Sequence, residues 1–196
     1  EICACLVGSE MCIRDRFIPG REFRIFIIND EVVGILHRVP ANVTGDGVLN
    51  IGQLIDRKNE DPLRGKGYRT PLEKIRKGRE EEMFLKQQGM DFNTVPKEGE
   101  VVYLRENSNI STGGDSIDFT DDIDDSYKAI AVEAAKALNV KITGLDMMIQ
   151  DIHAPATPDN YAIIEMNFNP AIHIHCYPFK GKNRHLNHKM IRALGF

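Results

Sequence analysis

The sequence predicts an α+β fold, in which helices flank a mainly antiparallel sheet. Charged and apolar residues alternate in REFRIFII and in EVVGILHRV, on either side of Asn29 and Asp30, which predicts a β-hairpin within residues 17–38. Two later stretches, Ile142–Ile149 and Tyr161–Phe168, each have one apolar face and predict a second pair of strands. Apolar residues recur at helical spacing over residues 124–139, so we expect a helix that covers one face of the sheet.

The segment between these two strand pairs has a different character, because glycine and proline punctuate short helical stretches. We expect helices at Ile51–Asn59 and Thr70–Gln88, the second interrupted, if at all, at Gly78. Its start, Thr70-Pro71-Leu72-Glu73, has the order of an N-cap, a first-turn proline and a capping-box glutamate. The segment from about residue 45 to about residue 100 is therefore predicted to form a helical insertion. A short strand over 99–105, a loop over 106–116 and a last helix near 187–194 complete the prediction.

Charge and hydropathy exclude some classes of partner. The 196 residues carry a formal net charge of −4 and offer no broad cationic surface, so we expect neither a nucleic acid nor a membrane as partner. No apolar run approaches the roughly 20 residues that span a bilayer, and we expect a cytoplasmic protein.

The first 16 residues differ in character from the rest of the chain. Cys3, Cys5 and Cys12 crowd together while Cys176 stands alone far downstream, a spacing that suits neither a disulfide framework nor a zinc site. The stretch EICACLVGSEMCIRDR also lacks the cationic start and long apolar stretch of a signal peptide. We interpret residues 1–16 as a non-native segment and residues 17–196 as the domain.

Three oxygen-bearing side chains occupy matching positions on the two later strands. Asp146 lies on the polar face of the first strand, and Glu165 and Asn167 lie on the polar face of the second. If the connection closes symmetrically, Asp146 is opposite Glu165, with Asn167 two residues along. Opposed carboxylates repel, so a cation is expected between them, and hard oxygen ligands suit magnesium. The alternative is that both acids simply face solvent.

Two arginines and a glycine-bearing loop are candidate anion sites. The planar guanidinium groups of Arg24 and Arg38, on the first hairpin, can pair bidentately with a phosphate or a carboxylate, although both arginines could instead form surface ion pairs. In ENSNISTGGDS, the consecutive N–H groups of Gly113 and Gly114 can approach an anion closely, although such a loop can also be a plain turn.

The residues after the carboxylate motif are expected to serve the same site. His173 and His175 alternate on an extended segment, and we expect them to line or brace a substrate pocket, because magnesium prefers oxygen ligands. Cys176 is expected to be a buried small apolar residue and not a nucleophile.

Nearly all of the chain after residue 16 resembles ATP-grasp ligases. FIPGREFRIFIINDEVVGILHRVPANVTGDG resembles the start of the second half of the ATP-grasp domain in bifunctional glutathione synthetases and in cyanophycin synthetases. YLRENSNISTGGDSID resembles their glycine-bearing loop, and Asp146 with EMNFNP resembles their magnesium site. HIHCYPFKGKN and LNHKMIRALGF resemble the closing residues of bifunctional glutathione synthetases. The resemblance implies the C-terminal half of an ATP-grasp fold.

This resemblance implies a role for each candidate residue. Phe17 and Ile18 would belong to the hinge beside adenine, Glu22 would hold the ribose hydroxyls, and Arg24 and Arg38 would be the catalytic cations. The substrate or phosphate loop would comprise Arg105, Asn109, Gly113 and Gly114, and the metal, Mg²⁺ or Mn²⁺, would be held by Asp146, Glu165 and Asn167.

The implied reaction is the phosphorylation of γ-glutamylcysteine by ATP and the displacement of phosphate by glycine, which gives glutathione and ADP. The chain would be an incomplete fragment, inactive alone, whose partners are the upstream ATP-grasp half and a glutamate–cysteine ligase domain of the same polypeptide. Two alternatives stay open: the ATP-grasp region of a cyanophycin synthetase, and a non-catalytic nucleotide- or metal-binding fragment.

Overall fold

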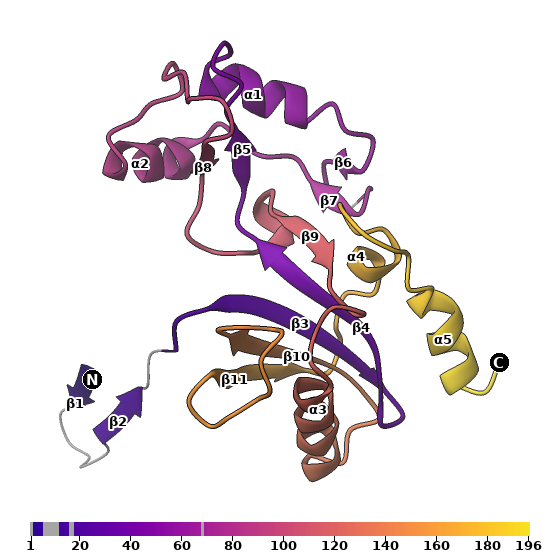
Figure 1. Cartoon of the computed structure of the whole chain (residues 1–196). Helices are drawn as coiled ribbons and strands as arrows, with labels where there is room; N and C mark the ends of the chain where they lie inside the picture. The colour runs from indigo at the N-terminus through magenta and orange to yellow at the C-terminus, as the bar shows by residue number, and fades with distance from the viewer. Residues whose placement is uncertain (1, 6–11, 16–17, 68) are drawn as a thin grey trace.

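The chain folds around one five-stranded antiparallel sheet, described by a computed structural model for residues 2–5, 12–15, 18–67 and 69–196 (Figure 1). The strand order is β11-β10-β3-β4-β9. These strands are β3 (Arg21–Ile28), β4 (Glu31–Val39), β9 (Asp115–Asp118), β10 (Ile142–Ile149) and β11 (Tyr161–Asn167). Helices and antiparallel strands together confirm the predicted α+β class.

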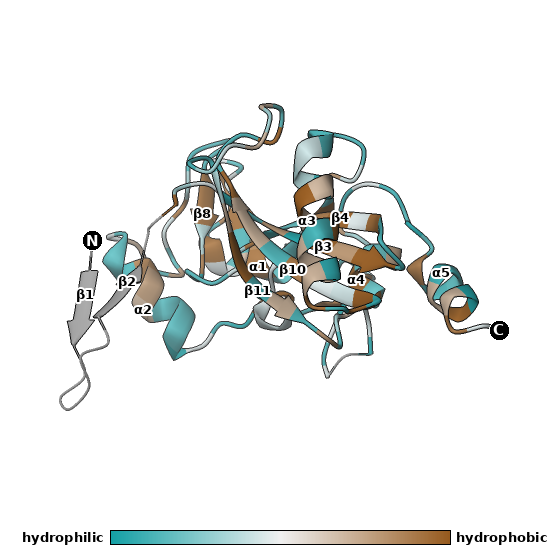
Figure 2. Cartoon of the chain, turned by 90° about the horizontal axis from the view of Figure 1, so that it is seen from below, coloured by the Kyte–Doolittle hydropathy of each residue, from teal (hydrophilic) through white to brown (hydrophobic). Residues whose placement is uncertain are grey.

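The first hairpin forms as the sequence predicts. Asn29 and Asp30, which join β3 to β4, have φ angles of 47° and 64°, the left-handed pair that matches the twist of a two-residue hairpin. The strand alternation then places Phe23, Ile25 and Ile27 on one face of β3. Helix α3 (Asp125–Ala137) covers this face and completes the main core. Figure 2 shows the apolar residues concentrated on these central strands.

The insertion has a core of its own. Helices α1 (Ile51–Lys58) and α2 (Arg79–Gln87) pack with the strand pair β5 (Asn42–Thr44) and β8 (Val101–Tyr103). A capping box starts α1: the Asn50 side chain accepts a hydrogen bond from Gln53 N, and the Gln53 side chain accepts one from Asn50 N. The predicted insertion, about residues 45–100, is therefore not a separate helical unit, because it shares its core with β5 and β8, which flank it.

The predicted helix start at Thr70 is wrong. Leu72–Glu73 forms a short strand, β7, which pairs in parallel with β6 (Arg64–Gly65), and the helix α2 begins only at Arg79. The Thr70 hydroxyl donates to the carbonyl of Leu72, and no helix begins at this position. A residue before proline is biased towards extended backbone, which explains why the capping pattern does not start a helix here.

The C-terminal segment covers the second face of the sheet. It contains the one-turn helix α4 (His173–Cys176) and helix α5 (Leu186–Ala193), and Cys176 and Leu186 pack against Phe26 in a third apolar cluster. The extended segment predicted at His173 and His175 is thus wrong, whereas the burial of Cys176 is confirmed. Among the described residues, no helix is long and apolar enough to cross a membrane.

A short helical turn and an N-terminal strand pair complete the described chain. A 3₁₀ turn, η1 (Ile110–Thr112), interrupts the predicted loop, and strand β9 begins within its last residues. Strands β1 (Ile2–Cys5) and β2 (Cys12–Asp15) pair antiparallel at the N-terminus. The assignment of residues 1–16 as non-native stays a prediction.

Candidate active site

Strand register brings acidic and basic side chains from three strands into one line. Asp146 on β10 is directly opposite Glu165 on β11, as the sequence pattern predicts. On its other side Asp146 is directly opposite Arg24 on β3. Directly opposed residues share a face of the sheet, so Glu165, Asp146 and Arg24 form a line across it, which we call the acid–arginine row.

Asp146 is the centre of this row. Its side chain is buried, and it accepts hydrogen bonds from Arg24 through Nε and Nη2, the latter at 2.7 Å from Oδ2. Arg38 Nη2 also donates to Asp146 Oδ2, at 2.9 Å. The two arginines from β3 and β4 thus meet at one carboxylate. Hydrogen bonds between charged groups are the strong ones, and they fix both guanidinium planes.

Glu22 extends the network outward. It forms an ion pair with Arg38 and accepts a hydrogen bond from the hydroxyl of Ser108. Arg38 Nε is buried and has no hydrogen-bond partner among the described residues, so one donor of this guanidinium is unused. Ser108 is not among the predicted site residues, because a serine within a run of Asn, Ser and Gly is typical of a plain turn.

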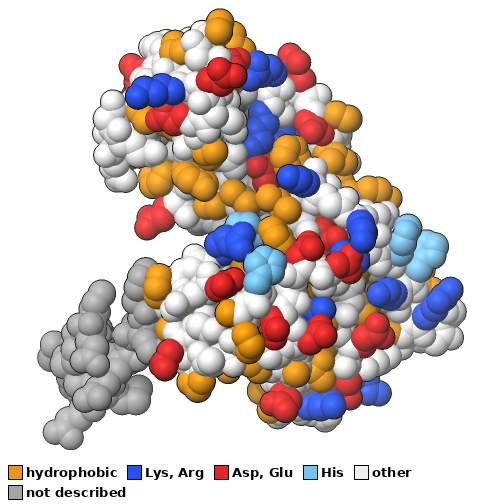
Figure 3. All heavy atoms as spheres, viewed as in Figure 1, with side chains coloured by type: hydrophobic (Ala, Val, Ile, Leu, Met, Phe, Trp, Pro, Cys, Tyr) orange, Lys and Arg blue, Asp and Glu red, His pale blue; other side chains and the backbone are white. Residues whose placement is uncertain are grey.

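A cleft of about 680 Å³ opens beside Glu22 and Arg38, between the sheet and the insertion. The start of β3 and the end of β4 form one wall, and Phe84 of α2 and Tyr103 of β8 form the other. Arg105 and Asn109, both predicted substrate-loop residues, also line it. The space-filling view shows a notch at this place, between the upper and lower lobes (Figure 3). Its volume is in the range of ligand sites.

The predicted metal ligands provide oxygen donors on the same face. Glu165 is exposed, and Asn167 Nδ2 donates to its Oε1 at 2.9 Å, which turns the amide oxygen of Asn167 away from that contact. Nowhere in the described ranges do three His, Cys, Asp or Glu side chains gather as a metal site. The predicted set contains two carboxylates and one amide, and these hard donors suit Mg²⁺.

The remaining predicted residues have varied surroundings. Arg105 pairs with Glu81 at 2.6 Å and with Glu80, so its charge is already balanced. The N–H groups of Gly113 and Gly114 donate to carbonyls of their own loop, at Ile110 and Asn109. The structure therefore does not present these two N–H groups to an anion, and their part in binding stays a prediction.

Of the two predicted hinge residues, one lies among the residues that the structure describes. Ile18 is buried, and Phe17 lies outside the described residues.

His175 is fully buried behind the site. Its ring packs edge-on against Phe26, and neither ring nitrogen has a hydrogen-bond partner among the described residues. Burial, together with the nearby Arg24 charge, lowers the pKa of His175 to about 3, so the imidazole is neutral. This histidine braces the face of the sheet that carries the acid–arginine row.

A buried charge cluster joins the insertion to the sheet. Asp115 on β9 forms ion pairs with Arg64 on β6 and, at 2.6 Å, with Lys58 on α1. Asn42 on β5 also donates to it, at 3.0 Å. Burial lowers the pKa of Lys58, against the effect of Asp115. Breaking such a buried cluster is costly, so these contacts hold one wall of the cleft against the other.

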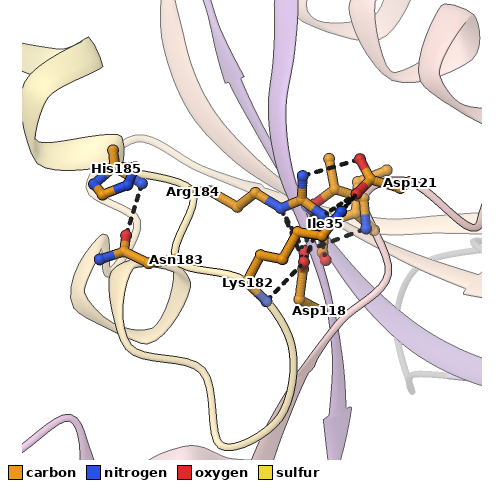
Figure 4. Close-up of polar contacts among 8 residues, drawn as sticks. Ile35, Asp118, Asp121, Lys182, Asn183, Arg184 and His185 are labelled. Carbon is orange, nitrogen blue, oxygen red and sulfur yellow. Dashed lines mark hydrogen bonds and ion pairs between the residues drawn. The ribbon is translucent and has the colours of Figure 1, made fainter.

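A second cluster ties the C-terminal segment to β9 (Figure 4). Arg184 Nε donates to both oxygens of Asp118, at 3.0 and 2.9 Å, and its Nη1 donates to Asp121 at 2.9 Å. Burial alone would raise the pKa of Asp118, but the hydrogen bonds from Arg184 and Thr120, together with the Arg184 charge, outweigh it and lower that pKa. Lys182 also pairs with Asp121. These contacts anchor the segment that follows α4.

Comparison with known proteins identifies the class. No family model matches the chain. In structure it matches a bifunctional glutathione synthetase from Pasteurella multocida with a TM-score of 0.82 and 46% sequence identity, over 91% of this chain and 25% of that one. The chain therefore has the fold of one part of a bifunctional glutathione synthetase. This agrees with the resemblance of its sequence to ATP-grasp ligases.

Curated relatives narrow the identification to bifunctional enzymes. The chain is 65% identical over 182 residues to the glutathione biosynthesis bifunctional protein of Desulfotalea psychrophila, and 59% identical over 180 residues to that of Clostridium perfringens. The matches cover 93% and 92% of this chain, but it spans only 23% of either relative's length. The chain is thus a relative of one segment of the bifunctional glutathione biosynthesis proteins.

Proposed function

We propose that this chain carries one wall of the site of an ATP-dependent ligase, which joins γ-glutamylcysteine to glycine and forms glutathione through an acyl phosphate. One observation carries the proposal: Asp146, Arg24, Arg38 and Glu22, from three strands, form one connected network beside a cleft of about 680 Å³. The similarity to bifunctional glutathione biosynthesis proteins supports the choice of product.

The arginines suit the charge that such a reaction develops. Phosphoryl transfer to a carboxylate spreads negative charge over the transferred oxygens, and catalysis depends on positioning and on preorganised cations. Arg38 lines the cleft, so its guanidinium, held in place by Asp146 and Glu22, would face a phosphate or a carboxylate bound there. Asp146 holds the guanidinium of Arg24, which comes from β3, the strand next to that of Arg38. Arg24 would act at the inner end of the site.

The acids suit the nucleotide and its metal. Glu22 lines the cleft and could accept hydrogen bonds from the ribose hydroxyls, in exchange for the one from Ser108. Asp146, Glu165 and Asn167 would hold Mg²⁺, or Mn²⁺ in its place, and the bound ion would offset phosphate charge.

The proposal includes a larger polypeptide in the cytoplasm. Relatives are about four times as long as this chain, since it spans 23% of them. We propose that an upstream ATP-grasp half supplies the opposite wall for ATP, and that a glutamate–cysteine ligase domain of the same polypeptide makes γ-glutamylcysteine.

The test is ADP release by the complete polypeptide, measured with and without each substrate. Release should require both γ-glutamylcysteine and glycine, and an Asp146→Asn variant should lose it. The Asp56→Asn variant is the matched control, because Asp56 pairs with Lys77 on the exposed surface of the insertion. ADP release that needs neither substrate would favour a module of different specificity. No ADP release from the unaltered protein would favour a non-catalytic module.

A further inference from the structure

Two glycines flank Phe26 in the row next to the acid–arginine row. Gly144 on β10 is directly opposite Phe26 on β3, and Phe26 is directly opposite Gly34 on β4. Neither glycine has a positive φ, so the backbone at both positions would accept any residue. Their value must therefore lie in the space that a missing side chain leaves. Glycine inside a strand often marks such a close approach.

At Gly144 that space is filled from two sides. A Cβ atom added there would lie 2.7 Å from the Cβ of Pro170, which follows the metal motif, and 3.0 Å from the Cδ of Arg24. At Gly34 an added Cβ would meet only the C-terminal segment, 2.8 Å from Nδ1 of His175 and 3.4 Å from Leu186. Of the two glycines, only Gly144 touches the acid–arginine row.

The contact with Arg24 matters because Cδ is the atom next to Nε. Arg24 reaches across to Asp146 with both Nε and Nη2, and the pair is buried. A methyl group at residue 144 would push this part of the stem away, since real Cβ atoms are rarely that close to a neighbour. The two parallel hydrogen bonds require a fixed guanidinium plane, so a small shift of Cδ would disturb both.

We propose that Gly144 is a positioning residue for the ligation reaction: by lacking a side chain it lets the Arg24 stem lie close to β10 at residue 144 and hold its guanidinium against Asp146. This inference rests on the proposed function and adds a residue that acts through Arg24, without touching substrate. Pro170 fills the rest of the space beside Gly144.

The test is a double-mutant cycle in the complete polypeptide. Gly144→Ala should lower kcat by about tenfold, because the Arg24 stem must give by a few tenths of an ångström and a misplacement of about 1 Å can cost about 100-fold. In an Arg24→Lys background the same change should lower kcat less than about threefold, because residues that act as a unit are not additive. An equal loss in both backgrounds would overturn the proposal.

Matched controls separate positioning from simple crowding. Gly34→Ala introduces the same methyl group in the same row but meets His175 and Leu186 and not Arg24, so kcat should fall less than about twofold. Gly144→Ala with Pro170→Gly removes the clash with proline and leaves the one with Arg24, so its kcat should stay low. Recovery of kcat in this double variant, or an equal loss in Gly34→Ala, would show that Gly144 only seats the C-terminal segment.

A readout without activity keeps the inference distinct from the proposed function. In a crystal structure of the Gly144→Ala polypeptide, the 2.7 Å contact between Arg24 Nη2 and Asp146 Oδ2 should lengthen by a few tenths of an ångström, to about 3.0–3.2 Å. An unchanged contact would overturn the positioning role, even in an active ligase. If Arg24 is displaced in the variant but the unaltered polypeptide shows no ligase activity, the placement of Arg24 by Gly144 is supported and the proposed function is refuted. If Gly144→Ala does not fold, the double variant with Pro170→Gly gives the same comparison.

Discussion

Replacement of Asp146 by asparagine should destabilise the protein measurably. The carboxylate is 2% exposed, and it is the partner of two guanidinium groups that are themselves mostly buried. Removing one partner of a buried ion pair typically costs about 3–5 kcal/mol, because the opposite charge is left uncompensated. Since Glu22 stays beside Arg38, we expect the low end of this range, about 3 kcal/mol.

This energy converts to a shift in melting temperature that calorimetry can resolve. A loss of 1 kcal/mol lowers the Tm of a domain this size by about 2–4 °C, so Asp146→Asn should lower it by about 6–12 °C. Asp56→Asn removes an acid from an exposed ion pair with Lys77 and should cost under about 1 kcal/mol. An Asp146→Asn variant with an unchanged or higher Tm would refute the reasoning, because the buried charges would then cost more than their pairing returns.

Three further results are expected. Arg24→Lys and Arg38→Lys should each lower ligase turnover by about 100-fold, since a point charge cannot replace the planar fork, and near-normal steady-state rates would return these residues to a structural role. The pKa of His175 is lowered from 6.5 to about 3, so the unfolded chain binds a proton that the folded chain excludes, and stability is complete above pH 6.5 and falls as the pH drops. At pH 5 the free energy of unfolding should be about 2 kcal/mol lower than at pH 7 because of His175. Urea unfolding at the two pH values should show that His175→Leu loses this part of the pH dependence. An equal pH dependence in both proteins would contradict the role of His175. The 196-residue chain alone should make no glutathione, because one wall of the site cannot position ATP; substrate-dependent ADP release within about tenfold of the complete polypeptide, roughly 1.4 kcal/mol of barrier, would contradict this.

Local pattern was enough to predict most of the sheet. Alternating residues and a two-residue turn define β3 and β4, and the helical spacing over 124–139 predicts α3. The opposition of Asp146 and Glu165 also follows from local pattern, because β10 and β11 are consecutive in the chain and pair antiparallel.

The centre of the candidate site could not be predicted in this way. Arg24 and Asp146 are 122 residues apart in sequence, and their pairing depends on β3 lying beside β10, which no local pattern encodes. The helix start at Thr70 was wrong for a related reason. The backbone of Leu72 and Lys74 bonds to Leu63 and Gly65, and this pairing overrides the capping signal.

The most direct measurement is a crystal structure of the complete polypeptide with Mg²⁺ and a non-hydrolysable ATP analogue. We predict that the ion binds oxygens of Asp146, Glu165 and Asn167 at about 2.1 Å, with Arg24 and Arg38 facing the phosphates. Carboxylates of Asp146 and Glu165 more than about 8 Å apart, too far to share one ion, would contradict the account, as would a nucleotide bound away from the cleft beside Glu22.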